Sequence, residues 1–178
     1  MKKCLILSLF TLLALVLGAG TGFSSANAQS RSNHINLGVG YMIENTMEAT
    51  VGFEHETKYH NSWEYFISGS LKYEDCTDCG HICNESFWNN YNTIGGGVCY
   101  KPCVIRARNN HGNLRLGASG NIASTGSFVT GIHAAYEHTY ALRSGWNIYW
   151  QVKCDGMING KDNIRGGFAI GLKLPCGK

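Results

Sequence analysis

The sequence predicts an all-β fold, an eight-stranded antiparallel up-and-down β-barrel of the outer-membrane kind with a polar, plugged interior. Three observations support this prediction. The chain begins with an export signal, the remainder shows no sustained helical periodicity, and eight segments of about ten residues alternate between apolar and polar side chains. About ten residues is the length that a tilted strand needs to cross a bilayer.

The start of the chain has the layout of a secretory signal peptide. Lys2 and Lys3 precede the apolar run CLILSLFTLLALVLGAG, and Ala26-Asn27-Ala28 fits the small-x-small cleavage rule. An uncleaved membrane anchor is the alternative. We expect a removed signal peptide over 1–28 and a single transmembrane β-barrel domain over 29–178.

The composition argues against several classes of function. Without Lys2 and Lys3 the chain has 13 of its 15 basic residues against 12 acidic ones, a net charge of +1, and it contains no Lys/Arg block. No electrostatic basis for direct nucleic-acid binding remains, so none is expected. The sequence also shows no phosphate-binding loop and no paired-carboxylate catalytic motif, and we expect no cofactor.

The strands are placed by the alternation and by the turn residues between them. Asn109-Asn110-His111-Gly112-Asn113 is typical of a hairpin turn, because Asn and Gly tolerate left-handed backbone angles. Alternation breaks near Pro102, where we expect a bulge or a strand end. The expected strands are His34–Ile43, Glu48–Thr57, Trp63–Tyr73, Phe87–Tyr100, Asn113–Ile122, Phe128–Tyr140, Trp146–Cys154 and Asn163–Leu174.

Each strand has an apolar face and a polar face, and alternation alone does not say which is inside. A soluble lipocalin-like barrel puts the apolar face in, whereas a membrane barrel puts it out. Glycine on the polar face favours the membrane barrel. On a water-exposed strand glycine only costs backbone entropy, but inside a narrow barrel it makes room for long charged side chains.

The charges on the polar face are balanced, which suits a closed interior of paired ions better than an open pore. The acidic residues on this face are Glu48, Glu54, Glu56, Glu64 and Glu137, and the basic ones are Lys72, Arg115, Lys153, Arg165 and Lys173. From them we predict an interior charge network made of Glu54, Glu56, Glu64, Lys72, Arg115, Glu137, Lys153 and Arg165.

The apolar face is then expected to contact outer-membrane lipid. The hairpin over 135–152 is expected to present Tyr136, Ile148, Trp150 and Val152 to it. With the N-terminus in the periplasm, the periplasmic connections are those near His60, Asn110 and Ser144. The long 76–86 connection falls on the outer side, where such barrels keep their long loops.

The segment Cys76-Thr-Asp-Cys79-Gly-His81-Ile-Cys83 is the most conspicuous cluster of reactive side chains. Three thiols and an imidazole could surround zinc, but zinc sites usually draw ligands from two separated pairs. In exported proteins cysteines more often form disulfides. The disulfide candidates are therefore Cys76, Cys79, Cys83 and Cys154; free thiols are the second possibility, and no metal site is predicted.

An enzyme is the main alternative function. Some small outer-membrane barrels are lipid hydrolases or acyltransferases that use Ser and His near the outer rim. Ser86 with His81 is the one local pair expected to face outward, and no motif places an orienting acid beside it. We therefore predict no catalytic residue and no enzymatic activity.

The C-terminal two-thirds of the chain resembles a known family. The segments VCYKPCVIRARNNHGNLRLGASG and AAYEHTYALRSGWNIYWQVKCDGMINGKDNIRGGFAIGLKLP are similar to the conjugal transfer protein TraO of Bacteroides-type conjugative transposons. The similarity is most specific over 109–116, 136–151 and 159–162. The chain departs from the family in its CTDCGHIC loop, and it ends in LPCGK rather than in the terminal aromatic residue that many outer-membrane barrels use for assembly.

The resemblance implies a function that no residue pattern above shows. Members of this family are small outer-membrane barrels that take part in the apparatus moving DNA between cells. The resemblance therefore implies that this chain is a structural protein of the cell outer membrane, and that its partners are lipid and other conjugative transfer proteins. A lipid-modifying enzyme and a soluble lipocalin-like binding barrel remain the alternatives.

Overall fold

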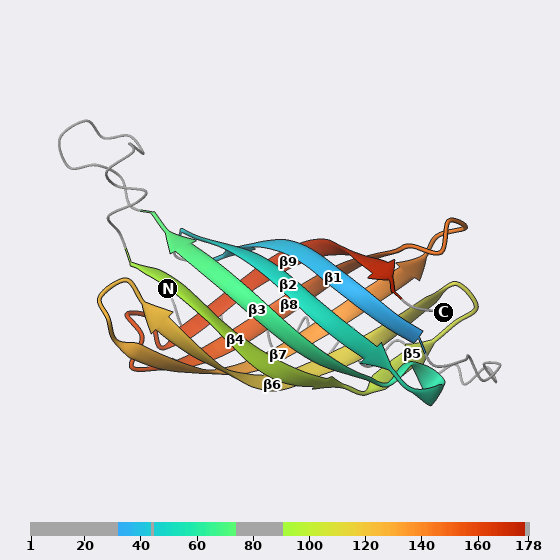
Figure 1. Cartoon of the computed structure of the whole chain (residues 1–178), viewed down its shortest axis with the longest axis horizontal. Helices are drawn as coiled ribbons and strands as arrows, with labels where there is room; N and C mark the ends of the chain where they lie inside the picture. The colour runs from blue at the N-terminus through green and yellow to red at the C-terminus, as the bar shows by residue number, and fades with distance from the viewer. Residues whose placement is uncertain (1–31, 44, 74–90, 177–178) are drawn as a thin grey trace, which may run out of the picture.

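The computed structural model describes residues 32–43, 45–73 and 91–176, which form one antiparallel β-barrel (Figure 1). The expected signal peptide and the 76–86 connection lie outside the described residues. No helix in the described part of the chain is long and apolar enough to span a bilayer.

The described residues form strands and one short 3-10 helix. The elements are β1 (Ser32–Met42), β2 (Thr46–Glu56), η1 (Lys58–His60), β3 (Ser62–Lys72), β4 (Asn92–Lys101), β5 (Cys103–Arg106), β6 (Asn110–Ala123), β7 (Phe128–Ala141), β8 (Asn147–Ile158) and β9 (Ile164–Pro175).

The barrel is closed by pairing of its first and last strands. In the β1–β9 pair Leu37 lies opposite Leu172, and every neighbouring pair of strands is antiparallel. β4 and β5 form one interrupted strand, because Pro102 separates them and both pair with β6, with a register shift between Cys103 and Ile105. The predicted eight-stranded antiparallel barrel and the break near Pro102 are confirmed.

The strand bounds differ from the expected ones at several strand ends. β4 begins at Asn92 and not at the expected Phe87, and 87–90 lie outside the described residues. The predicted hairpin turn over 109–113 is wrong, because β6 already begins at Asn110 and His111 pairs with both Arg106 and Thr139. The connection therefore spans only 107–109. β8 also continues to Ile158, beyond the expected end at Cys154, because its pairing with β7 extends that far.

The apolar face of the strands forms the outer wall. Side chains more than half exposed on this wall include those of Val39, Val51, Ile67, Ile94, Ile132 and Ile170. The alternate positions are buried inside the ring and are mostly polar or charged. This arrangement is the opposite of a lipocalin-like barrel, so the soluble alternative does not describe this fold.

Tyr136 is an exception on the outer wall. Strand parity places it with Ile148, Trp150 and Val152 as expected, but its side chain is only 3% exposed. The ring lies against Gly112, where an added Cβ would be 3.0 Å from Tyr136 Cζ, and 5.6 Å from the ring of Trp150. The prediction that Tyr136 faces lipid is wrong, because these neighbours cover it.

The barrel has two different ends. At the first, here called the termini end, lie the start of β1, the end of β9 and the short connections 57–61, 107–109 and 142–146. The end of β1, the end of β3, the start of β4 and the connections 124–127 and 159–163 lie at the opposite end (Figure 1). This alternation follows directly from the up-and-down topology.

Glycine inside the barrel allows two strands and an aromatic ring to meet, which gives a first prediction. In a Gly97→Ala variant the new Cβ would lie 2.8 Å from both Phe66 Cζ and Ser119 Cβ. We expect a loss of about 1–3 kcal/mol in the free energy of unfolding, measured by urea denaturation in lipid vesicles. Gly69→Ala is the matched control, since nothing lies within 4 Å of a Cβ at that position. Equal stability of the two variants would contradict this packing.

Candidate functional site

A ring of alternating charges crosses the barrel interior near the termini end. Lys101 Nζ lies 2.9 Å from Glu54 and 2.8 Å from Glu137, and Lys173 Nζ lies 2.9 Å from Glu54 and 2.7 Å from Glu137. These residues come from β2, β4, β7 and β9, which is every second strand around the barrel. Each of these ion pairs therefore joins two strands that are separated in the sheet by one intervening strand.

Further ion pairs and polar side chains join this ring of charges, and together they form what we call the central cluster. Arg115 Nε is 2.6 Å from Glu64 Oε2, and Lys101 Nζ is 3.3 Å from the same carboxylate. Asn36 and Ser62 donate hydrogen bonds of 2.7 and 2.8 Å to Glu54. Three carboxylates thus meet three cations, which is the compensation that buried charges require. The cluster leaves no net charge to attract a passing ion.

A second set of ion pairs occupies the interior toward the opposite end. Lys153 Nζ lies 2.6 Å from Glu48 and 3.0 Å from Asp155, which also bonds His133 at 2.7 Å. This set also contains the ion pairs Lys72–Asp162 at 2.7 Å and Arg165–Asp162 at 3.9 Å.

The eight residues of the predicted charge network all have buried side chains on the inner face, but they do not form one network. Glu54, Glu64, Glu137 and Arg115 belong to the central cluster, whereas Lys72, Lys153 and Arg165 lie toward the opposite end and Glu56 lies at the termini end. The predicted network omitted Glu48 and Lys173, which had been placed on the polar face, and also Lys101, Asp155 and Asp162. Strand parity could have placed Lys101 and Asp155 inside, since they follow Cys99 and Lys153 at a spacing of two.

Several apolar side chains also fill the interior and were not predicted there. Phe66 lies under the guanidinium of Arg115 at 4.5 Å, and Tyr149 lies 5.7 Å from Lys173 Nζ. Both occupy the inner parity of their strands, next to charged neighbours. They cover the alkyl and planar parts of the charged side chains and so reduce the empty space between them.

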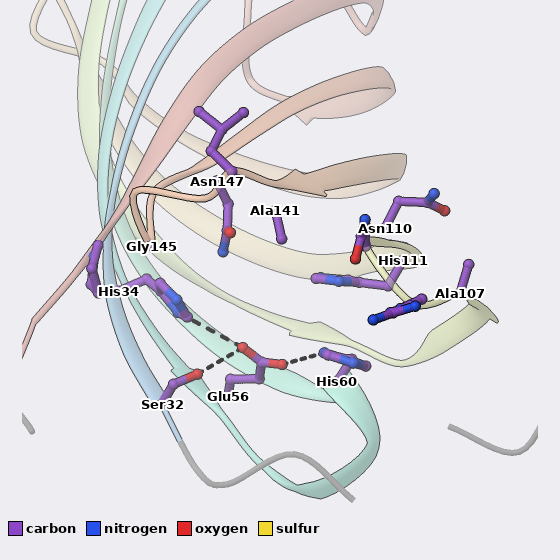
Figure 2. Close-up of a pocket in the computed structure, with 14 residues that line it drawn as sticks. Ser32, His34, Glu56, His60, Ala107, Asn110, His111, Ala141, Gly145 and Asn147 are labelled. Carbon is purple, nitrogen blue, oxygen red and sulfur yellow. Dashed lines mark hydrogen bonds and ion pairs between the residues drawn. The ribbon is translucent and has the colours of Figure 1, made fainter. Parts of the chain in front are cut away.

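A hollow of about 360 Å³ lies at the termini end, above the central cluster, and we call it the mouth hollow (Figure 2). Its lining comes from all around the ring: the starts of β1 and β8, the ends of β2 and β9, η1, and the β5–β6 and β7–β8 hairpins. The polar residues of the lining are Ser32, His34, Glu56, His60, Arg108, Asn109, Asn110, His111 and Asn147.

Glu56 is the one carboxylate that lines the mouth hollow, and its charge is already engaged. Ser32 Oγ donates a 2.8 Å hydrogen bond to Glu56, His60 Nδ1 bonds its other oxygen, and His34 Nδ1 lies 3.8 Å away (Figure 2). His60 also stacks on His111, with ring centroids 4.4 Å apart and planes 12° from parallel. Two non-glycine residues with positive φ, Tyr59 (67°) and His60 (62°), hold this imidazole in place.

The described cysteines are free thiols: Cys99, Cys103, Cys154 and Cys176. Cys76, Cys79 and Cys83 lie outside the described residues, and so do Ser86 and His81, the candidates for an enzymatic site. Within the described ranges, no group of three or more His, Cys, Asp or Glu side chains is arranged to hold a metal ion.

No protein-family model and no curated protein matches the chain. Among solved structures, the chain is similar to the crystal structure of Neisserial surface protein A, with 10% identity and a TM-score of 0.61 over 85% of this chain and 100% of that one. It is similar to the de novo designed TMB2.3, with 13% identity and a TM-score of 0.50 over 87% and 100% of the two chains. The outer membrane protein Ail of Yersinia pestis has 9% identity and a TM-score of 0.48 over 80% and 99%.

The first two likenesses concern the fold, since the sequence identities are low. Together with the closed ring of eight antiparallel strands, they define the class of structure: a small β-barrel of the outer-membrane kind.

Proposed function

We propose that the protein is a structural, non-enzymatic component of a conjugative transfer apparatus in the outer membrane, exported with a signal peptide that is cleaved after Ala28. One observation carries the membrane assignment: the outer wall of the closed barrel is apolar and exposed, while the charged side chains are inside. This is the polarity of a transmembrane barrel, whose lipid-facing and lumen-facing residues alternate.

The role in conjugation is supported by the resemblance to the TraO family. Two of its most specific segments lie at the termini end: 109–116 covers the start of β6, and 136–151 covers the β7–β8 hairpin. We propose that this end faces the periplasm, where it contacts other transfer proteins. The short connections there suit the periplasmic side of such barrels.

The interior supports a structural role rather than a channel. The ring formed by Glu54, Lys101, Glu137 and Lys173 crosses the lumen, and eight strands leave space only for side chains. We propose that this layer plugs the barrel, so that neither DNA nor small solutes pass through it.

Deletion of the gene tests the proposal. We expect a large drop in the transfer frequency of the host element, restored when the gene is supplied on a plasmid, because the apparatus would lack an outer-membrane component. The control is growth and outer-membrane integrity of the donor, which should be unchanged. Unchanged transfer in the deletion strain would rule out the role in conjugation while leaving the membrane barrel intact.

A further inference from the structure

We infer that the mouth hollow is a binding site for an acidic peptide segment of a partner protein, whose carboxylates are held by Arg108 and by the imidazole and amide groups of the lining. The identity of that partner as another transfer protein rests on the proposed function. The chemical class of the segment follows from the hollow alone.

The position of the hollow favours a peptide over a lipid headgroup. Its lining comes from elements around the whole ring, so it lies within the circle of strands and not on the lipid-facing wall. Figure 2 shows Ser32 and His34 on one side of the hollow, with Asn110 and His111 across from them. A volume of about 360 Å³ accommodates a few side chains, which is too little for a broad nucleic-acid contact.

The free charged group of the lining is a hydrogen-bond donor. Arg108 is exposed and has no ion-pair partner among the described residues. His34 is only 6% exposed, and its Nδ1 lies 3.8 Å from Glu56 without a hydrogen-bond partner in the part of the chain that the structure describes. A buried nitrogen without a hydrogen bond is costly, so a ligand that reaches it from the hollow would lower that cost. Arg108 adds the planar fork that binds carboxylates with two parallel bonds.

The surroundings of the hollow also favour an anion. The connections 57–61, 107–109 and 142–146 contain Lys58, Arg108 and Arg143 but no Asp or Glu. The one carboxylate in the lining, Glu56, already accepts bonds from Ser32 and His60. The 74–90 segment, in contrast, contains four acidic residues. The connections at the termini end therefore carry basic and no acidic side chains, and complementary charge guides partners to such a surface.

The backbone beside the hollow is held in an unfavourable conformation. Tyr59 and His60 both adopt positive φ, and this brings His60 against Glu56 and onto the ring of His111. Non-glycine residues in this region carry a conformational cost and persist where the surrounding structure requires them, often at binding sites. The stacked imidazoles form a rigid wall opposite His34.

Binding of a labelled peptide to the purified barrel in detergent micelles tests the inference. We expect fluorescein-labelled hexaglutamate to bind and hexalysine not to bind. In Arg108→Gln the dissociation constant for hexaglutamate should rise about tenfold, because a charge-assisted contact is lost. Arg143→Gln is the matched control: it removes the same charge from the same end of the barrel, but Arg143 does not line the hollow, so a change below about twofold is expected.

Three results would overturn the inference: no binding of hexaglutamate to the wild type, equal losses in the two variants, or tighter binding of single-stranded oligothymidylate than of hexaglutamate. The heat-modifiable migration of each variant verifies that it is folded. The assay requires no conjugation. If the deletion abolishes transfer but the purified barrel does not bind hexaglutamate, the peptide site is refuted and the proposed function stands. If the barrel binds hexaglutamate but the deletion leaves transfer unchanged, the proposed function is refuted and the peptide site stands.

Discussion

Replacing Lys101 with methionine is expected to destabilise the barrel by roughly 3–5 kcal/mol, because removal of one partner leaves buried carboxylate charge without compensation. The Lys101 side chain is 0% exposed, and its Nζ contacts three carboxylates at 2.8–3.3 Å. In Lys101→Met three buried carboxylates, those of Glu54, Glu64 and Glu137, would share only Lys173 and Arg115. Urea unfolding in lipid vesicles, followed by tryptophan fluorescence, measures the loss.

Two further variants test whether the loss of stability in Lys101→Met comes from the uncompensated buried charge. Arg143→Gln, at an exposed hairpin tip, should change the unfolding free energy by less than about 0.5 kcal/mol. The double variant Lys101→Met with Glu137→Gln restores equal numbers of buried charges and should recover part of the stability lost in Lys101→Met. A Lys101→Met protein as stable as the wild type would show that the ring of charges does not hold the barrel together.

The ring of charges shows where sequence reasoning reaches its limit. Alternation along β2 and β7 predicts that Glu54 and Glu137 face inward, and both are buried. Their pairing through Lys101 and Lys173 depends on which strands face each other across the closed lumen. No spacing along the chain encodes that arrangement, because each ion pair passes over an intervening strand.

The outer wall illustrates a second limit. Period-2 patterning predicted the side of the sheet for most of the apolar residues, and most strand bounds agree with the structure to within a few residues. It did not predict that Tyr136 is buried, because depth depends on neighbours across the sheet, here Gly112 and Trp150. Likewise, Pro102 interrupted the alternation just after Lys101, so the inward position of that lysine was missed.

The mouth hollow could not have been predicted from the sequence for a similar reason. His34, His60 and His111 are far apart along the chain and carry no metal-site or catalytic spacing. They meet because the starts and ends of antiparallel strands gather at one end of a closed barrel. The positive φ of His60, which aims its ring at Glu56, follows from the local turn and not from residue type.

Replacing Ile67 with arginine is expected to cost about 2–4 kcal/mol when the barrel folds into a bilayer, because the charge would lie at the membrane midplane. Ile67 is 64% exposed on the outer wall and lies at the middle of β3, opposite Val51 and Gly96. In a soluble barrel the same change on an exposed position would be close to neutral. The measurement is the free energy of folding into phospholipid vesicles, relative to the wild type.

The position-matched control is Phe128→Arg. Phe128 is 62% exposed, almost the same as Ile67, but it is the first residue of β7 and so lies near the edge of the apolar band. Arginine there should cost only about 0–1 kcal/mol, because its guanidinium can reach the interface. A large difference between the folding free energies of the two variants requires an environment whose polarity changes with depth, and a bilayer is such an environment. Equal costs for Ile67→Arg and Phe128→Arg would refute the assignment of the outer wall to lipid.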